Sequence, residues 1–328
     1  MRLLLLTVML LLAIPTHAQA DENGFAHWLF TFKQRAAAKG LEPQFLSQKL
    51  TGVEYLPRVI ELDRKQPENK ITFAKYKKNI VTQTRIEDGR KRYLENRTLL
   101  NRIANQYNVP PQYIVALWGI ETNYGRVTGN FDIISSLATL AYEGRRADFF
   151  ENELVLALRI LQEGHAGTDR LIGSWAGAMG QCQFMPQSYM KYAVDGDGDG
   201  DVDIWNSLPD IFASIANYLH TEGWQGDTRW GRAVKVTRHI PESAYGRDKM
   251  KPLSEWQRAG VTLPNGKPLP NMTDGNDPKA ALIAPDGPGN ATYLVYGNYN
   301  VIMHWNRSTY FATSVGLLAD GIAAASGK

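Results

Sequence analysis

The chain has 328 residues, of which 44% are hydrophobic and 21% are charged, as in an ordinary globular protein of one large domain or two modest ones. Its 36 Lys and Arg residues stand against 33 Asp and Glu residues, a formal net charge of +3. No basic block is interleaved with aromatic residues, so the composition argues against nucleic acid as a partner. A single cysteine, Cys182, excludes an internal disulfide.

Residues 1–20 have the features of a secretory signal peptide. Arg2 precedes an apolar run over residues 3–14, and a small-residue Ala-Gln-Ala sequence ends at Ala20, where we expect cleavage. The alternative is an uncleaved membrane anchor, but this run is shorter than the roughly 20 residues that a spanning helix needs. The single cysteine is far from the cleavage site, so we expect no lipid-bearing cysteine there. The sequence predicts an exported, periplasmic protein without a membrane anchor.

The segment after this leader has mostly helical periodicity. The stretch AHWLFTFKQRAAAKG predicts a helix that ends at Gly40, and two shorter helical pieces follow. The stretch RKRYLENRTLLNRIANQYN, residues 90–108, predicts one helix because its apolar residues recur at helical spacing. Residues 110–125, PPQYIVALWGIETNYG, predict the next helix, with proline in its first turn and Gly125 at its end.

Two further amphipathic helices are predicted over residues 147–164 and 208–224. Residues 223–297 differ, because turns such as NGKP and PDGPGN separate short alternating stretches, which predicts a small β lobe. A helix over residues 298–328 then returns to the core and ends the chain. The predicted fold class is α+β, mostly helical, with a small β lobe.

Glu121 is the first candidate for catalysis, because it lies in an otherwise apolar helix. On that helix it shares a face with Leu117, Trp118 and Tyr124, and such surroundings raise the pKa of a carboxyl group. A protonated carboxyl beside a glycine-lined space suits general-acid cleavage of an acetal. Two alternatives remain: an exposed residue in the last helical turn, or a buried partner for an arginine.

The segment GSWAGAMGQCQFMPQSY, residues 173–189, is rich in small residues interleaved with polar ones. Its glycines allow the backbone to approach a ligand closely, while Ser174, Gln181 and Gln183 can bond a polar, uncharged ligand such as a sugar. Tight helix packing explains the same composition equally well.

The sequence DGDGDGDVDIW, residues 195–205, resembles an EF-hand calcium loop. Gly200 falls at the sixth position, but Asn206 replaces the glutamate of the twelfth, a role that Asp210 could take. We expect a structural calcium ion rather than a sensor, and an exposed acidic turn without metal is the alternative. The candidate ligands alternate along the loop: Asp195, Asp197, Asp199, Asp201 and Asp203.

These motifs occur together in one family. WGIETNYG, YEGRRADFF, GSWAGAMGQCQFMP, the aspartate loop and the late WNRS follow in the same order as in the B-type lytic murein transglycosylases, which the chain resembles from about residue 25 to residue 322. The resemblance implies a lysozyme-like catalytic domain with a small β lobe and an EF-hand-like loop. After the signal peptide, residues 21–328 then divide into four parts: 21–105 (N-terminal helices), 106–222 (lysozyme-like core), 223–297 (β lobe) and 298–328 (returning helix).

In that family the glutamate of the WG-x-E-T motif, here Glu121, is the sole catalytic carboxylate. Trp305 departs from the family pattern, because we expect tyrosine there. Because the sequence stops at Lys328, soon after its final predicted helix, we expect it to lack the C-terminal peptidoglycan-binding module that some relatives carry. The resemblance further implies a set of residues that bind the glycan or its peptide: Arg145, Arg146, Ser174, Gln183, Asn306 and Tyr310.

The implied reaction cleaves the MurNAc–GlcNAc β-1,4 bond of peptidoglycan without water and leaves a 1,6-anhydromuramoyl end. One carboxylate suffices when the substrate's 2-acetamido group acts as nucleophile, and the nearby Asp132 and Glu143 lie in polar, turn-like contexts. No organic cofactor is expected. Glycan strands, and other cell-wall enzymes, are the implied partners. Two alternatives are a lysozyme-like hydrolase and a noncatalytic, calcium-dependent glycan-binding protein.

Overall fold

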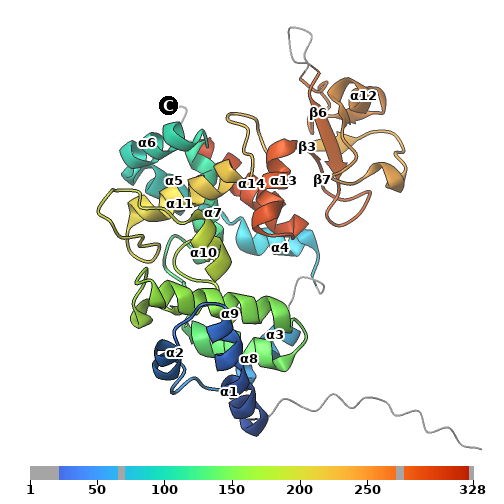
Figure 1. Cartoon of the computed structure of the whole chain (residues 1–328). Coiled ribbons are helices and arrows are strands. Elements are labelled where there is room, and N and C mark those ends of the chain that lie inside the picture. The colour runs from blue at the N-terminus through green and yellow to red at the C-terminus, as the bar shows by residue number, and fades with distance from the viewer. Residues whose placement is uncertain (1–21, 66–70, 271–276, 325–328) are drawn as a thin grey trace, which may run out of the picture.

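The computed structural model describes residues 22–65, 71–270 and 277–324, and the expected signal peptide lies outside them. Within these residues, no helix is long and apolar enough to cross a membrane. Figure 1 shows two groups of helices, one around α8 and α9 and the other around α7, with a strand-containing lobe beside α13.

The helices of the first group pack around α8, which buries its residues from Ile133 to Ala141. Asp132 caps this helix, because its Oδ1 accepts a hydrogen bond from the Ser135 backbone N–H at 2.7 Å. N-terminal and central segments therefore share one hydrophobic core. The group comprises α1 (Glu22–Ala38), α2 (Pro43–Lys49), α3 (Pro57–Arg64), α8 (Ile133–Glu143) and α9 (Ala147–Gln162).

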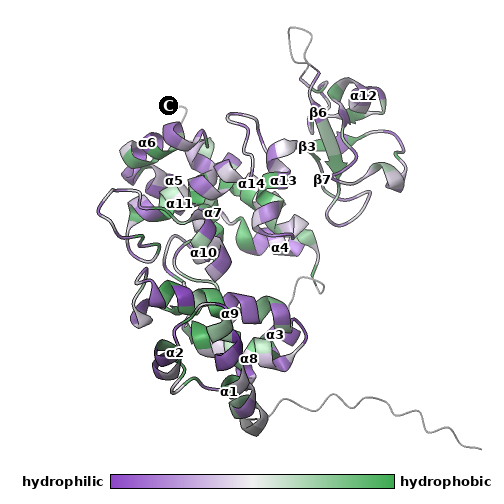
Figure 2. Cartoon of the chain, in the orientation of Figure 1, coloured by the Kyte–Doolittle hydropathy of each residue, from purple (hydrophilic) through white to green (hydrophobic). Residues whose placement is uncertain are grey.

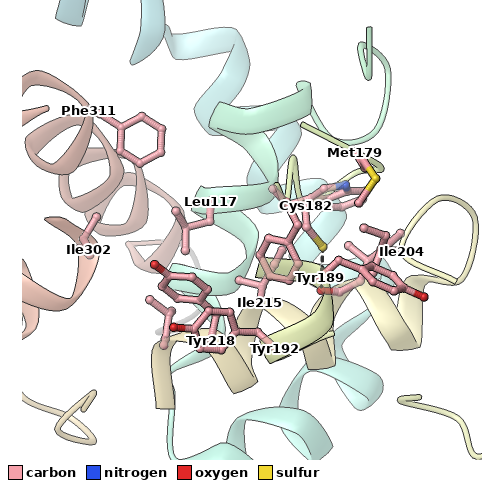
Figure 3. Close-up of a cluster of buried hydrophobic side chains, with 14 of the residues drawn as sticks. Leu117, Met179, Cys182, Tyr189, Tyr192, Ile204, Ile215, Tyr218, Ile302 and Phe311 are labelled. Carbon is pink, nitrogen blue, oxygen red and sulfur yellow. Dashed lines mark hydrogen bonds between the residues drawn. The ribbon is translucent and has the colours of Figure 1, made fainter. Parts of the chain in front are cut away.

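The second group surrounds α7, which is buried from Tyr113 to Gly119 and contacts α5, α6, α11 and α14. A helix covered on all sides is apolar all round, which explains its sequence. Figure 3 shows Leu117 of α7 among the buried side chains between these helices. The group comprises α4 (Phe73–Ile80), α5 (Gln83–Glu95), α6 (Arg97–Tyr107), α7 (Pro111–Thr122), α10 (Pro186–Tyr192), α11 (Leu208–Thr221), α13 (Gly297–Trp305) and α14 (Thr309–Ala323).

Two helices expected from the sequence are each divided in the structure. Residues 90–108 contribute to α5 and α6, because Asn96 leaves the helical conformation and its side chain bonds the Arg92 carbonyl oxygen at 2.9 Å. The last helix is divided at Asn306, whose backbone is extended, and Ser308 caps α14. The expected boundary between residues 105 and 106 falls inside α6.

The expected β lobe is present. Its strands form an antiparallel five-stranded sheet in the order β4-β6-β7-β3-β5. A separate small core includes Trp256 and Leu282, and Figure 2 shows β6 and β7 as hydrophobic. A two-stranded pair, β1 (Phe131–Asp132) with β2 (Ile172–Gly173), lies outside the lobe. The lobe comprises β3 (Gly231–Val236), β4 (Lys251–Pro252), α12 (Leu253–Arg258), β5 (Val261–Thr262), β6 (Lys279–Ile283) and β7 (Thr292–Val295).

Candidate active site

Glu121 lies in the last turn of α7, where the backbone reverses sharply. Asn123, Tyr124 and Gly125 all have left-handed conformations, with φ of 50°, 62° and 80°. The Tyr124 ring folds back over the helix, so closely that a Cβ at Gly119 would lie 2.6 Å from it. The glycines of WGIETNYG thus allow the turn that follows the carboxyl group.

The Glu121 side chain is partly buried, and one carboxyl oxygen has a defined partner. The indole Nε1 of Trp305 donates a hydrogen bond to Glu121 Oε1 at 2.7 Å. Burial raises the pKa of Glu121 from 4.5 to about 7, and the bond from Trp305 opposes this rise. A carboxyl with a pKa near neutrality can both give and take a proton.

Trp305 is held by aromatic neighbours. Its ring centroid lies 5.2 Å from that of Phe184 and 4.6 Å from that of Tyr218. These contacts join the end of α13 to the small-residue segment and to α11, so the orientation of the indole is fixed by packing. The sequence marked position 305 only as a departure from the expected tyrosine, and pairing with Glu121, 184 residues away, required the fold.

Gln181 joins α7 to the small-residue segment. Its Oε1 accepts a hydrogen bond from Trp118 Nε1 at 2.8 Å, and its Nε2 donates to the Trp205 carbonyl oxygen at 2.7 Å. A Cβ at Gly125 would lie 2.2 Å from Gln181 Oε1, so glycine is required there. With its amide engaged in this way, Gln181 is a structural residue that aligns the two segments.

Cys182 is buried beside this junction (Figure 3). Burial raises the pKa of its thiol, and the nearby Glu121 and Asp210 raise it further. The thiol is therefore neutral and packs as a small apolar group.

The small-residue segment holds Ser174 and Gln183 in defined positions. Ser174 and Ala178 exchange hydrogen bonds, with the Ala178 N–H donating to Ser174 Oγ at 2.9 Å. Gln183 has a left-handed φ of 51°, and its Nε2 donates to the carbonyl oxygens of Thr128 and Gly180, both at 3.1 Å. Both side chains are partly exposed and remain candidates for binding substrate.

Arg145 and Arg146 lie between α8 and α9, where both pair with Asp63 of α3. Asp63 is 3% exposed, whereas the arginines are 51% and 42% exposed. The Arg146 guanidinium also lies 4.6 Å from the centroid of the Phe150 ring. This ion pair holds α3 against the turn between α8 and α9, a structural role that the sequence reading did not anticipate.

Asn306 and Tyr310 lie where α13 passes into α14. Asn306 Oδ1 accepts a hydrogen bond from the Ser308 N–H at 3.0 Å. Tyr310 donates its hydroxyl to Asp286 Oδ1 at 3.0 Å, and its ring contacts Phe73. Asn306 directly follows Trp305, whereas Tyr310 bridges α4, α14 and the loop between β6 and β7.

Other carboxylates in the central region have structural partners. Asp132 caps α8, and Glu143 pairs with Arg64 at 2.9 Å. Glu153, which the sequence reading missed, is 1% exposed and accepts a hydrogen bond from the Gln187 N–H at 2.9 Å. Burial raises the pKa of Glu153 as well, so it serves as an internal comparison for Glu121.

The aspartate loop gathers three carboxylates, and only two of them are from the expected set. Oxygens of Asp195, Asp197 and the buried Asp210 all lie within 4.8 Å of one another. Asp201 and Asp203 instead pair with Arg170, at 2.9 and 3.3 Å.

Asp210 and Asp199 both accept hydrogen bonds from backbone N–H groups of the loop. The Asp210 carboxylate accepts hydrogen bonds from the backbone N–H groups of Gly196 and Asp203, both at 2.7 Å. Asp199 accepts one from the Asp201 N–H at 2.8 Å. Asp210 therefore fastens both ends of the loop to the start of α11.

Most of the chain is similar to known transglycosylases. Residues 24–320 match the model of the transglycosylase SLT domain family. The chain is 33% identical over 298 residues to the membrane-bound lytic murein transglycosylase B of Escherichia coli (strain K12), covering 87% of this chain and 80% of that one.

Solved structures with a similar fold include lytic transglycosylases of two bacteria. SltB3 from Pseudomonas aeruginosa, in complex with NAG-anhNAM-pentapeptide, has a TM-score of 0.85 and 41% identity, covering 91% of this chain and 79% of that one. The Escherichia coli lytic transglycosylase Slt35, in complex with calcium, has a TM-score of 0.78 and 30% identity, covering 96% and 99%. By its sequence and its fold, the chain belongs to the transglycosylase SLT domain family, among the B-type lytic transglycosylases.

Proposed function

We propose that this lytic transglycosylase cleaves the MurNAc–GlcNAc β-1,4 bond of peptidoglycan with Glu121 as its single catalytic carboxylate. The observation that carries the proposal is the state of this side chain, which is partly buried, bonded to Trp305 and raised in pKa to about 7. Membership of the family and the muropeptide bound by the similar SltB3 support peptidoglycan as the substrate.

In the first step Glu121 protonates the glycosidic oxygen as the bond to the anomeric carbon breaks. An indole N–H can only donate, so Glu121 Oε1 must offer a lone pair to Trp305, which favours the acidic proton on Oε2. The 2-acetamido oxygen of the muramoyl residue attacks the anomeric carbon and holds the positive charge.

In the second step the Glu121 carboxylate removes the proton of the C6 hydroxyl group. The C6 oxygen then bonds the anomeric carbon and displaces the acetamido oxygen, which yields the 1,6-anhydro ring and restores the protonated glutamate. No water is consumed. The pKa near 7 suits both roles, because neither protonation state is strongly disfavoured near neutral pH.

Six residues are proposed to contact the glycan or its peptide. Ser174 and Gln183 are supported by their exposure on the segment that Gln181 aligns with α7, and Asn306 by its place next to Trp305. Arg145 and Arg146 keep about half of their side-chain surface exposed despite their pairing with Asp63. Tyr310 completes the set, since it is partly exposed at the start of α14.

We also propose a structural calcium ion in the aspartate loop, held by Asp195, Asp197 and Asp210. Calcium takes oxygen ligands at 2.3–2.6 Å, and three oxygens within 4.8 Å of one another fit a single ion. The calcium complex of Slt35 supports the assignment. Asp201 and Asp203 would balance Arg170 instead. The ion would stiffen the loop between α10 and α11.

Export to the periplasm is proposed from the leader sequence and from the substrate, since peptidoglycan lies outside the cytoplasm. The sequence of residues 1–20, which has the features of a signal peptide, supports this placement.

The proposal is tested by replacing Glu121 with glutamine, which keeps the shape but removes the acid. We expect the rate of peptidoglycan cleavage to fall by a factor of at least about 10², which is the lower end of the rate enhancement that general acid–base catalysis provides. The matched control is Glu153→Gln, because Glu153 is also buried but bonds only the Gln187 backbone in the described structure. Cleavage that survives in Glu121→Gln, or is lost equally in both variants, would contradict the role of Glu121.

A further inference from the structure

A cavity of about 700 Å³ lies at the junction of the β lobe and α13. Its walls come from the segment before β3, from β3 itself, from the starts of α12 and β6, and from the first residues of α13. Figure 1 places β3 and α13 side by side. None of the residues considered above for catalysis or metal binding lines this cavity.

The cavity is strongly basic. Arg229, Arg232 and Lys279 line it, against one acidic residue, Asp227, a net charge of 3 − 1 = +2. Among the residues that the structure describes, none of the three basic side chains forms a salt bridge. Burial raises the pKa of the nearby Asp320, and both arginines lower it. The Asp320 carboxylate accepts a hydrogen bond from the indole N–H of Trp230 at 3.1 Å.

Two buried polar groups lie together at the cavity, the Tyr296 hydroxyl, on a side chain that is only 6% exposed, and the Arg232 guanidinium, and they interact with each other. Nε of Arg232 is buried and has no hydrogen-bond partner among the described residues. The Arg232 guanidinium lies 5.6 Å from the centroid of the Tyr296 ring. Buried donors without partners cost folding free energy, and a bound acceptor would relieve that cost.

The start of α13 adds a further positive field. This nine-residue helix begins at Gly297, its N-cap residue Tyr296 makes no side-chain capping bond, and its first turn has no acidic residue. The Tyr299 N–H bonds the Tyr296 carbonyl oxygen at 3.0 Å, and the helix dipole favours an anion at this end. The cavity therefore suits a ligand that carries negative charge, because the start of α13, two arginines, a lysine and a phenol all line it.

The same helix leads to the proposed acid. The last residue of α13 is Trp305, which bonds Glu121, and nine residues at 1.5 Å each place the helix ends about 13 Å apart. An anion in the cavity would thus lie one short helix away from the bond that is cut. A neutral sugar does not need three cations, whereas the peptide on a muramoyl residue carries carboxylates and alkyl groups that suit Met250 and Leu253.

We propose that this cavity binds a carboxylate of the peptide stem that substitutes the glycan strand. The inference rests on the proposed function, because it takes the stem of the same substrate as the ligand. Arg232 is the central ligand, since carboxylates are bound well by the planar guanidinium group. Lys279 and Arg229 add charge at the mouth, where both are exposed. The cavity would make the enzyme favour peptide-bearing strands.

The first test is a calorimetric titration with a free acidic stem tetrapeptide and with its fully amidated analogue. We expect the wild-type protein to bind the acidic peptide and not the amide, and Arg232→Gln and Lys279→Gln each to weaken binding by about tenfold, the loss of one charge-assisted bond. The matched control is Lys235→Gln, an exposed charge on β3 outside the cavity, which should bind like wild type.

The second test compares cleavage of peptide-bearing strands with that of strands whose peptides have been removed by an amidase. We expect Arg232→Gln and Lys279→Gln to raise KM on the peptide-bearing strands with kcat unchanged, and to leave the peptide-free strands unaffected. Unchanged peptide binding in both variants, equal loss in Lys235→Gln, or equal effects on the two substrates would overturn the proposal. Peptide-free strands cleaved normally by every variant would show that the proposed function stands even then. Melting temperatures of the variants exclude a loss through unfolding.

Discussion

Glu121 has a chemical environment that separates the two oxygens of its carboxyl group. Trp305 bonds Oε1, and the partly buried surroundings disfavour the charged form. The sequence predicted the apolar setting, because it depends on neighbours within one helix. It could not predict the indole donor, because that contact joins α7 to α13 through the tertiary fold.

The raised pKa of Glu121 has a consequence for stability. A carboxyl whose pKa is 4.5 when unfolded and about 7 when folded favours the native state at low pH, and this advantage is lost as pH rises through 7. Glutamine does not titrate, so the unfolding free energy of Glu121→Gln minus that of the wild type should rise by about 3 kcal/mol from pH 4 to pH 8, at 1.36 kcal/mol per pKa unit. Urea denaturation at several pH values measures it. A constant difference across this range would contradict the raised pKa.

The bond from Trp305 has its own test. Because this donor lowers the pKa of Glu121, Trp305→Phe should raise that pKa and move the alkaline limb of kcat/KM to higher pH. The change should accompany a lower maximal rate, because the carboxyl loses its fixed orientation. Trp28→Phe, which alters a tryptophan of α1, is the control and should leave the limb in place. A limb that stays at the wild-type pH in Trp305→Phe would rule out the positioning role.

At the scale of elements, predictions from short sequence intervals succeeded better than those that depend on distant partners. The α7 helix and the β lobe follow from local periodicity and turn residues. The residue-level roles of Arg145 and Arg146 do not, because Asp63, which holds them, lies on α3 about 80 positions earlier. Similarly, Arg170, which lies outside the EF-hand-like sequence, forms ion pairs with two aspartates of the loop, Asp201 and Asp203.

The aspartate loop predicts a thermal response to calcium. Bound calcium should raise the melting temperature, since ligand at ten times its dissociation constant adds about 1.4 kcal/mol to the unfolding free energy. We expect that constant to be on the order of 10⁻⁴ to 10⁻³ M, as in extracellular modules. Scanning calorimetry with calcium or a chelator measures the shift.

The variants of this loop separate its carboxylates. Asp195→Ala combined with Asp197→Ala should abolish the calcium-dependent shift. Asp199→Ala should keep most of it, because Asp199 lies outside the group of three convergent carboxylates. If millimolar calcium leaves the wild-type melting temperature unchanged, the structural-ion assignment is wrong.

For the whole molecule, one extended core joins the two groups of helices, and the lobe, which includes α12, has a small core of its own. Glu121 lies where α7, the small-residue segment and the end of α13 meet, so three parts of the chain that are far apart in sequence contribute to its position. The other end of α13 borders the lobe, and the basic cavity lies there. The class of fold was predictable from the order of helical and strand-rich segments, whereas the meeting of these segments at Glu121 depends on packing.

In the proposed reaction the glycan is cut without water. Purified peptidoglycan digested in heavy-oxygen water, followed by mass spectrometry, tests it most directly. We expect 1,6-anhydromuramoyl products, one water lighter than reducing sugars and free of the label, and we expect them to be lost with Glu121→Gln. Reducing muramoyl ends that carry the heavy oxygen would contradict this expectation and identify a hydrolase.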